Sequence, residues 1–421
     1  MSSPVVRGAP NSTGTPRVWI VVGCGLLVAL LAAPAGALGS GTRANVGASV
    51  PVPTATTPGP PLPAAIRSPP VAPAFQPVLG NWTQVPTNST PPTAQSGDMI
   101  YDPAAGEYVL FGGASGGSAL GSTWVFSHGT WTDLSPSLSV SPPARWYESF
   151  VWDAADGYAL LFGGRNPATD FNDTWSFNGT AWTQIVTSVA PPPITTGRTV
   201  YDPADGYVWL YGGYSIMVGA PNQYNFTWTY HAGVWTNITA HVTGAPPDPH
   251  EVSYAVYDSE DGYVLMYGGS ASGGANCTQP GNTWTYLNGT YVNLSASVGT
   301  SPPVGAGSRM MADDPAIGGV LLYGGWDGGS CRLSNETWVY RGDAWSQESL
   351  PWNPGPLWDG EIAGGGPAGS VLLFSGNTVE GTSYQSNQTW NFTPAVRASI
   401  AGGLIGDTPL TVHLSAVVAG V

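Results

Sequence analysis

The sequence predicts an all-β fold built from six similar four-stranded units. Charged residues make up only 9 % of the 421 residues, whereas Gly (58), Pro (40), Trp (18) and Tyr (19) are abundant. Aromatic residues favour strands, and Gly and Pro favour turns over helices. A segment of about 13 residues also recurs six times along the chain, with copies 49 to 56 residues apart. Strand-rich repeats of this length are typical of a radial array of small sheets.

The first 38 residues carry the pattern of an export signal. Arg7 and Arg17 precede an apolar run that begins at Val18, and the small residues A-G-A follow at 35–37. This order is typical of a secretory signal peptide. The run is also long enough to span a bilayer if it is not cleaved. We therefore expect residues 1–38 to be a signal peptide or a membrane anchor, and the rest of the chain to be extracellular, either secreted or anchored at the cell surface.

Residues 39–79 are rich in Pro, Ala, Ser and Thr and show no hydrophobic period. Such a segment buries too little apolar surface to fold and behaves as an extended spacer. We expect a Pro-rich, disordered stalk that separates the folded domain from the membrane or wall.

Residues 80–394 contain the repeats. The clearest copy is YDPADGYVWLYGG at 201–213, and the other copies start at residues 101, 152, 257, 313 and 364. A first strand is expected to end at the Asp, whose carboxylate caps a tight turn that ends on Gly. The apolar run after the turn predicts a second strand that is buried on both faces. The two glycines then let the chain leave that strand.

Two later markers give the third and fourth strands of each unit. A T-W pair follows each copy, at Trp124, Trp175, Trp228, Trp284, Trp338 and Trp390. A short turn then leads to a second aromatic residue, at Trp131, Trp182, Trp235, Tyr291 and Trp345. The sixth copy lacks this last marker, and an unmatched N-W-T-Q-V precedes the first copy at Trp82.

Together, the double glycine after an apolar strand and the Trp at the end of each unit resemble the kelch repeat, whose copies form a β-propeller. The resemblance covers about Gly80 to Pro394 and implies a six-bladed kelch-type propeller of four-stranded blades. Because the sixth copy lacks a fourth strand and Trp82 has no unit of its own, we expect the N-terminal strand to complete the last blade.

The last segment, 395–421, has strand-like alternation and includes T-P-L-T-V. It resembles the start of a polycystic-kidney-disease-type (PKD) immunoglobulin-like repeat. About 25 residues are too few for an independent sandwich of this kind. Either the PKD-like domain is truncated here or the segment docks elsewhere, and we expect truncation.

The composition and the motifs argue against several function classes. A formal charge of −15 disfavours nucleic acid as a partner. The five histidines show no metal-ligand spacing, so neither a metal nor any other cofactor is expected. An extracellular carbohydrate-active enzyme stays as the alternative function. A galactose-oxidase-like copper oxidase has no matching motif here, and the T-W segments, although similar to sialidase Asp-boxes, lack the leading S-x-D.

The two cysteines beyond the apolar segment predict a disulfide. Cys277 and Cys331 each precede a T-W tryptophan by seven residues, in adjacent copies. Equivalent loops of neighbouring blades approach each other, and export permits oxidation. Two unpaired thiols are the alternative.

Twelve N-x-S/T sequons beyond residue 80 are glycosylation candidates if the host has the machinery. They are Asn81, Asn88, Asn172, Asn178, Asn225, Asn237, Asn276, Asn288, Asn293, Asn335, Asn387 and Asn391.

Residues that break the repeat are the best candidates for function, because turn residues repeated in every blade serve the fold. Charged residues of the first strands are expected to line the central channel: Asp98, Glu148, Arg198, Arg309 and Glu361. The loops after the double glycine, together with the Pro-rich loops, are expected to form a ligand face with Arg165, Tyr214, Trp326, Asp327 and Arg332. Aromatic and Arg side chains anchor interfaces.

The sequence thus predicts a non-catalytic binding, adhesion or envelope module for an unknown protein or glycan. We expect membrane contact only through residues 1–38, if they are not cleaved.

Overall fold

The computed structural model describes residues 80–215, 222–248, 254–268, 281–302, 310–327, 332–378 and 385–394. The expected signal or anchor, the stalk and the PKD-like segment lie outside these residues. Within them, no helix is both long and apolar enough to cross a membrane.

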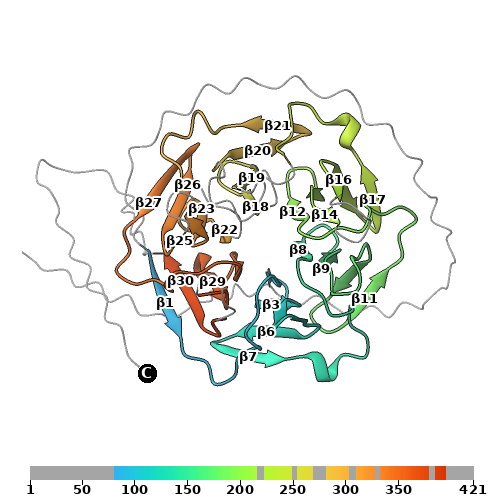
Figure 1. The fold of residues 1–421 in the computed structure, drawn as a ribbon, viewed down its shortest axis with the longest axis horizontal. Helices are drawn as coiled ribbons and strands as arrows, with labels where there is room; N and C mark the ends of the chain where they lie inside the picture. The colour runs from blue at the N-terminus through green and yellow to red at the C-terminus, as the bar shows by residue number, and fades with distance from the viewer. Residues whose placement is uncertain are drawn as a thin grey trace, which may run out of the picture. The chain divides into compact units, whose positions relative to one another are not determined.

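Six four-stranded antiparallel sheets, or blades, surround a common centre (Figure 1). Blade one consists of β2 (Asp98–Asp102), β3 (Glu107–Phe111), β6 (Thr123–Ser127) and β7 (Thr130–Asp133). Blade two consists of β8 (Ser149–Asp153), β9 (Tyr158–Phe162), β10 (Thr174–Phe177) and β11 (Trp182–Ile185). Blade three consists of β12 (Arg198–Asp202), β13 (Tyr207–Tyr211), β16 (Thr227–His231) and β17 (Val234–Asn237).

The remaining three blades continue around the ring. Blade four consists of β18 (Tyr254–Asp258), β19 (Tyr263–Tyr267), β20 (Thr283–Leu287) and β21 (Thr290–Asn293). Blade five consists of β22 (Met310–Asp314), β23 (Gly319–Tyr323), β26 (Thr337–Arg341) and β27 (Ala344–Glu348). Blade six consists of β28 (Glu361–Ala363), β29 (Val371–Phe374), β30 (Thr389–Pro394) and β1 (Gly80–Val85). The predicted all-β, six-bladed propeller is confirmed.

Short elements complete the described chain. Three small hairpins follow double glycines: β4 (Ala114–Ser115) with β5 (Ser118–Ala119), β14 (Tyr214–Ser215) with β15 (Asn222–Gln223), and β24 (Trp326–Asp327) with β25 (Arg332–Leu333). Three 3₁₀ turns are η1 (Ser135–Ser137), η2 (Thr239–His241) and η3 (Pro367–Gly369).

The repeated turn between the first and second strands forms as its residues dictate. In blade three, Asp202 Oδ1 accepts the backbone N–H of Ala204 at 3.0 Å, and Gly206 has a φ of 71°. Only glycine enters this left-handed region without strain. The second strand that follows is buried on both faces, and Val208, Trp209 and Leu210 are fully buried in β13.

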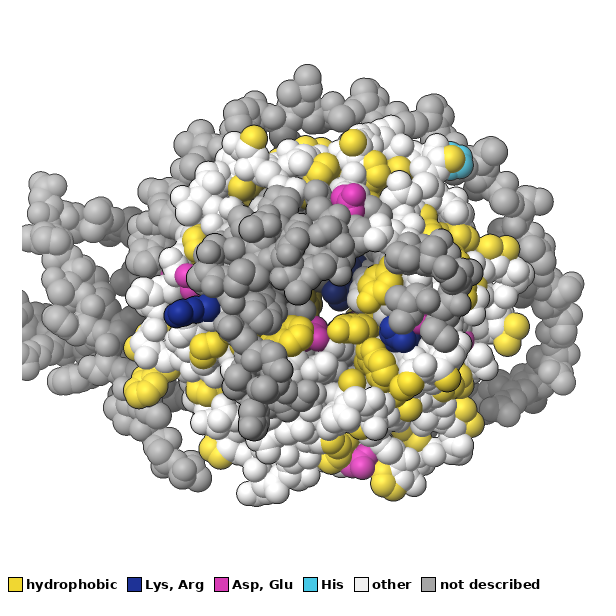
Figure 2. Space-filling view, in the orientation of Figure 1, with side chains coloured by type: hydrophobic (Ala, Val, Ile, Leu, Met, Phe, Trp, Pro, Cys, Tyr) yellow, Lys and Arg dark blue, Asp and Glu magenta, His cyan; other side chains and the backbone are white. Residues whose placement is uncertain are grey.

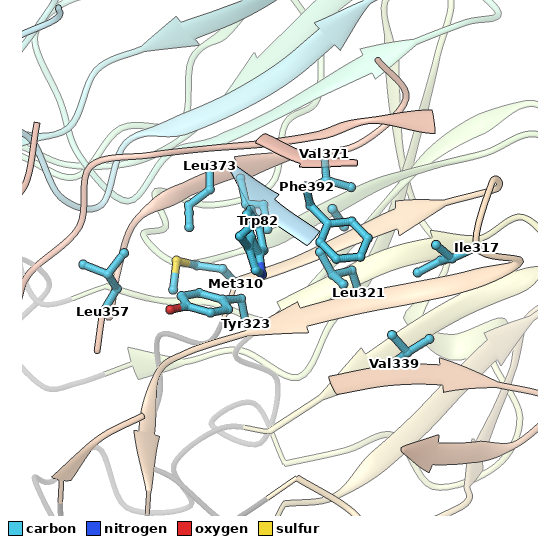
Figure 3. Packing of buried hydrophobic residues seen from close by; sticks show 12 residues of the cluster. Trp82, Met310, Ile317, Leu321, Tyr323, Val339, Leu357, Val371, Leu373 and Phe392 are labelled. Carbon is cyan, nitrogen blue, oxygen red and sulfur yellow. The ribbon is translucent and has the colours of Figure 1, made fainter. Parts of the chain in front are cut away.

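The N-terminal strand closes the ring. β1 pairs with β30 in antiparallel register from Gly80↔Pro394 to Val85↔Thr389. Trp82 is 1 % exposed and packs edge-on against Tyr323 of blade five and Phe392 of blade six (Figure 3). The predicted completion of the last blade by the Trp82 strand is therefore confirmed.

A repeated hydrogen bond, which we call the latch, joins each blade to the one before it. The aromatic residue of a fourth strand bonds the hydroxyl of the Thr that precedes Trp in the neighbouring third strand. In five latches, the indole N–H of Trp donates to the Thr hydroxyl, with nitrogen-to-oxygen distances of 2.9 to 3.1 Å: Trp82 to Thr337, Trp131 to Thr389, Trp182 to Thr123, Trp235 to Thr174 and Trp345 to Thr283. In the sixth, the hydroxyls of Tyr291 and Thr227 lie 2.7 Å apart. Both repeated markers thus serve blade packing.

Candidate functional site

The first strands of all six blades line a central cavity of about 390 Å³. We call the end where these strands begin the loop end, and the end with the D-x-x-G turns the turn end. Figure 2 shows a hollow at the centre of the viewed face, with charged and hydrophobic side chains around it. This channel is the candidate site.

The loop end brings together two kinds of loop, as expected. Backbone bridges join the segment before a first strand to the segment after the double glycine of the same blade, or after Ser375-Gly376 in blade six. The bridges are Gln95↔Ala114, Thr195↔Tyr214 and Trp358↔Asn377, and Trp146↔Arg165 repeats the pattern in blade two. The variable loops therefore share one face.

Four residues with left-handed backbone conformation lie at the loop end of the channel, in blades one, two, three and six. Ser96, Tyr147, Thr196 and Asp359 come shortly before first strands and have φ between 57° and 61°. Their backbones are linked from blade to blade: the N–H of Thr196 bonds Tyr147 O at 3.0 Å, that of Tyr147 bonds Ser96 O at 2.7 Å, and that of Ser96 bonds Asp359 O at 3.2 Å. A bulky residue such as Tyr147 is strained here, and such strain is common at functional sites.

Asp98 and Arg198 line the channel, where the sequence placed them. Asp98 Oδ2 accepts the N–H of Phe150 at 2.9 Å, so it links blades one and two. Burial raises the pKa of Asp98 to about 6, although its N–H donors and Arg198 act in the opposite direction. The Arg198 guanidinium lies 4.7 Å from the centre of the Tyr254 ring, a cation–π contact that also fixes its orientation.

Glu361 lies beside the channel at the loop end without lining it. It is 2 % exposed and accepts the N–H of Gly97 at 3.1 Å. Burial, together with the nearby Asp359 and Asp98 carboxylates, raises the pKa of Glu361 to about 8, although its backbone N–H donors act in the opposite direction. Glu361 is therefore mostly protonated at neutral pH.

Glu148 differs from its expected place, because it lies one residue before β8 and is 3 % exposed instead of lining the cavity. Blades one, three and six have glycine at this position: Gly97, Gly197 and Gly360. Gly112 makes room for the larger side chain, since a Cβ there would lie 2.1 Å from Glu148 Oε1. Neither carboxyl oxygen has a hydrogen-bond partner among the described residues. Burial raises the pKa of Glu148 well above its usual value, because a buried carboxylate without a partner is costly.

The residues expected on the ligand face lie in different settings. Arg165 is 15 % exposed, with Nε 3.7 Å from Asp170 Oδ1 and its guanidinium 5.7 Å from the Trp146 ring, so part of its charge is already balanced. Tyr214 in β14 is half-buried, and burial raises its pKa. Arg332 in β25 is exposed. The backbones of Trp326 and Asp327 form β24 opposite it.

Several predicted residues lie outside the described part of the chain. They are Arg309 of the expected channel lining, Cys277 and Cys331 of the expected disulfide, and the sequon residue Asn276. Of the other sequon residues, Asn81 and Asn391 are half-buried. The rest are exposed: Asn88, Asn172, Asn178, Asn225, Asn237, Asn288, Asn293, Asn335 and Asn387.

The repeated acids are turn caps, as expected. Asp102, Asp153, Asp202, Asp258 and Asp314 each accept the N–H of the residue two positions later at Oδ1. Across the described ranges, no group of three or more His, Cys, Asp or Glu side chains is arranged to hold a metal ion.

Sequence reasoning missed Trp352 and Arg145. Trp352 lies at the loop end, in the loop before blade six, and is 68 % exposed. The signal was present, because this Trp falls outside both repeated Trp positions. Arg145 is fully buried and bonds both carboxyl oxygens of Asp173, at 2.6 and 2.9 Å. Asp173 belongs to blade two, and the backbone N–H of Arg145 bonds Leu120 O of blade one at 2.9 Å, so Arg145 links the two blades.

Comparisons with known proteins agree with this architecture. Residues 74–269 match a family model described as the KLHDC2/KLHL20/DRC7 Kelch-repeats domain. A search of curated proteins finds no match. The matched segment runs from the closing strand β1 to the second strand of blade four, so over these blades the chain is similar to a kelch-repeat domain.

Proposed function

We propose that this protein is a non-catalytic binding module that holds a partner protein at the loop end of the propeller. One observation carries the proposal: Trp352 is 68 % exposed, whereas the other tryptophans with described side chains are buried or half-buried. Exposed Trp and Arg side chains are the commonest anchors of protein interfaces.

The surroundings of Trp352 support the same surface. Asn353 next to it accepts a hydrogen bond from the Asn335 side chain at 3.3 Å, which ties the Trp352 loop to the segment that follows β25. Arg332 in β25 is exposed in the same blade. The rigid blade below limits the entropy lost when a partner binds.

We also propose that the module acts outside the cell, in adhesion or in the envelope. The basic flank, apolar run and A-G-A pattern of residues 1–38 support this location. External protease added to intact cells should degrade the protein if it is displayed at the surface, and recovery of all of it in the soluble lysate would contradict the proposal.

The binding proposal is tested on arrays of extracellular proteins and glycans from the host, with the full chain as probe. We expect a protein ligand whose affinity falls about tenfold or more in Trp352→Ala, as for an interface anchor. Leu287→Ala is the matched control, because Leu287 is the last residue of β20 at the opposite end and is 40 % exposed. A ligand that Trp352→Ala and Arg332→Ala leave unaffected would contradict this surface, and binding to glycans alone would change the partner class.

A further inference from the structure

Aromatic side chains surround the turn end of the channel. In four consecutive blades, the fourth residue of the first strand is aromatic: Tyr101, Trp152, Tyr201 and Tyr257. All four line the cavity, and each is half-buried, with part of its surface packed on the core of a blade. We call these four residues the aromatic collar. Packing between blades uses part of each ring and leaves the rest facing the channel.

The equivalent positions in the last two blades are not aromatic. Blade five has Asp313, which lines the cavity and accepts the N–H of Ser259 at 3.3 Å. Blade six has Gly364, where a Cβ would lie 2.0 Å from the backbone oxygen of Asp313, so no side chain fits there. Burial raises the pKa of Asp313 to about 6, so its carboxyl group is largely ionised at neutral pH. The collar level of the channel therefore combines four aromatic rings with one carboxylate.

The surrounding turns add negative charge. The turns between first and second strands carry Asp102, Glu107, Asp153, Asp156, Asp202, Asp205, Asp258, Glu260, Asp261 and Asp314. Many of these carboxylates cap turns, but they still contribute to the field at the collar. Burial raises the pKa of Tyr201, and the nearby Asp153 and Asp202 carboxylates act in the same direction. In the hairpins of this end, all of which are described, Arg341 is the one Lys or Arg.

We propose that the aromatic collar and Asp313 bind a cationic side chain, arginine or lysine, presented by a partner protein at the turn end. The negative face of an aromatic ring attracts a cation, and the attraction increases in a partly desolvated site. A carboxylate next to the rings adds a charge-assisted hydrogen bond. The acidic turns would raise the local concentration of such a cation and repel nucleic acid. Partner binding at the loop end is a separate matter, because Trp352 and the collar lie at opposite ends of the channel.

The test uses two capped peptides of nearly equal size and shape: Gly-Gly-Arg-Gly-Gly and its citrulline counterpart, in which a neutral urea group replaces the guanidinium. Saturation-transfer NMR on the full chain should show saturable binding of the arginine peptide, with the citrulline peptide about tenfold weaker or more, since the ion pair and the cation–π contacts are lost. Asp313→Asn and Trp152→Leu should each weaken arginine binding about three- to tenfold. Added salt should weaken it as well.

Controls separate the site from the fold. Val140→Ala removes an exposed apolar side chain from the loop end and should leave arginine binding unchanged. Asp313→Asn decides the matter if Trp152→Leu unfolds, and circular dichroism checks both variants. Equal binding of the two peptides, binding that is unchanged in folded Asp313→Asn, or no binding at millimolar peptide would each overturn the proposal and leave the collar as packing between blades.

Discussion

Removing Trp82 should destabilise the whole propeller, because this side chain closes the ring. It is 1 % exposed, its ring centre lies 5.2 Å from that of Tyr323 and 5.4 Å from that of Phe392, and its indole N–H bonds Thr337 at 3.1 Å. Truncation of a buried Trp to Ala costs about 3 to 5 kcal/mol. Trp82→Phe keeps most of the apolar contact but leaves the Thr337 hydroxyl without its donor, for a cost of about 1 to 2 kcal/mol.

The assay is urea denaturation followed by far-ultraviolet circular dichroism, which reports on all blades at once. Trp352→Ala is the control, because truncation of an exposed side chain should change the free energy of unfolding by about 0.5 kcal/mol or less. Deletion of residues 80–88 should abolish the single cooperative transition. An unchanged melting curve for the deletion, or a cost for Trp82→Ala no larger than that of the control, would refute the closure argument.

Three further predictions concern buried groups and glycines. Burial raises the pKa of Glu361 from 4.5 to about 8. The stability that protonated Glu361 contributes is therefore full below pH 4.5 and is lost as pH rises to 8, by at most roughly 5 kcal/mol. In urea titrations between pH 5 and 8, the free energy of unfolding should decline less steeply in Glu361→Gln than in the unsubstituted protein, and parallel profiles would contradict this. Arg145→Met leaves the Asp173 carboxylate without its buried partner and should cost about 3 to 5 kcal/mol of stability. The double variant with Asp173→Leu should recover most of this cost, as thermal melts would show. Without such recovery, the cost would not come from the unpaired Asp173 carboxylate. Gly213 has a φ of 99°, and a Cβ there would lie 3.1 Å from a backbone oxygen, whereas Gly117, with a φ of 82°, has open space around it. Gly213→Ala should therefore cost about 1 kcal/mol or more of stability beyond the cost of Gly117→Ala. Thermal melts should show the lower melting temperature for Gly213→Ala.

The fold was predictable because the repeat specifies it redundantly. The turn, the buried strand and the two aromatic positions recur in each copy, so a copy with an unclear pattern can be interpreted from the others. Closure of the ring by the N-terminal strand was predictable because the sequence has one extra strand at Trp82 and lacks one strand after Trp390. The latch was not predicted, although both partners were recognised as markers. Trp182 and Thr123, for example, are 59 positions apart and lie in different blades. The spacing of residues within one blade does not show which residues of two neighbouring blades face each other.

The candidate site was predictable only in part. Asp98 and Arg198 were found because they break the repeat on strands that any propeller places at its centre. The burial of Glu148 depends on the space that Gly112 leaves in the neighbouring blade, which no local pattern reveals. Arg165 was expected on the ligand face, and the structure adds that Asp170 and the Trp146 ring lie near its guanidinium. Whether it also contacts a partner stays a prediction.

The antiparallel pairing of β1 with β30 has a mechanical consequence. Gly80 lies opposite Pro394, so the two points where the chain enters and leaves the ring are neighbours on one blade edge. A force that pulls these points apart loads the hydrogen bonds of the pair one after another, as in a zipper, instead of all at once. The strand that completes the ring is therefore also its weakest point under tension between the two ends, and such tension would open blade six while the other five blades still hold their folded sheets.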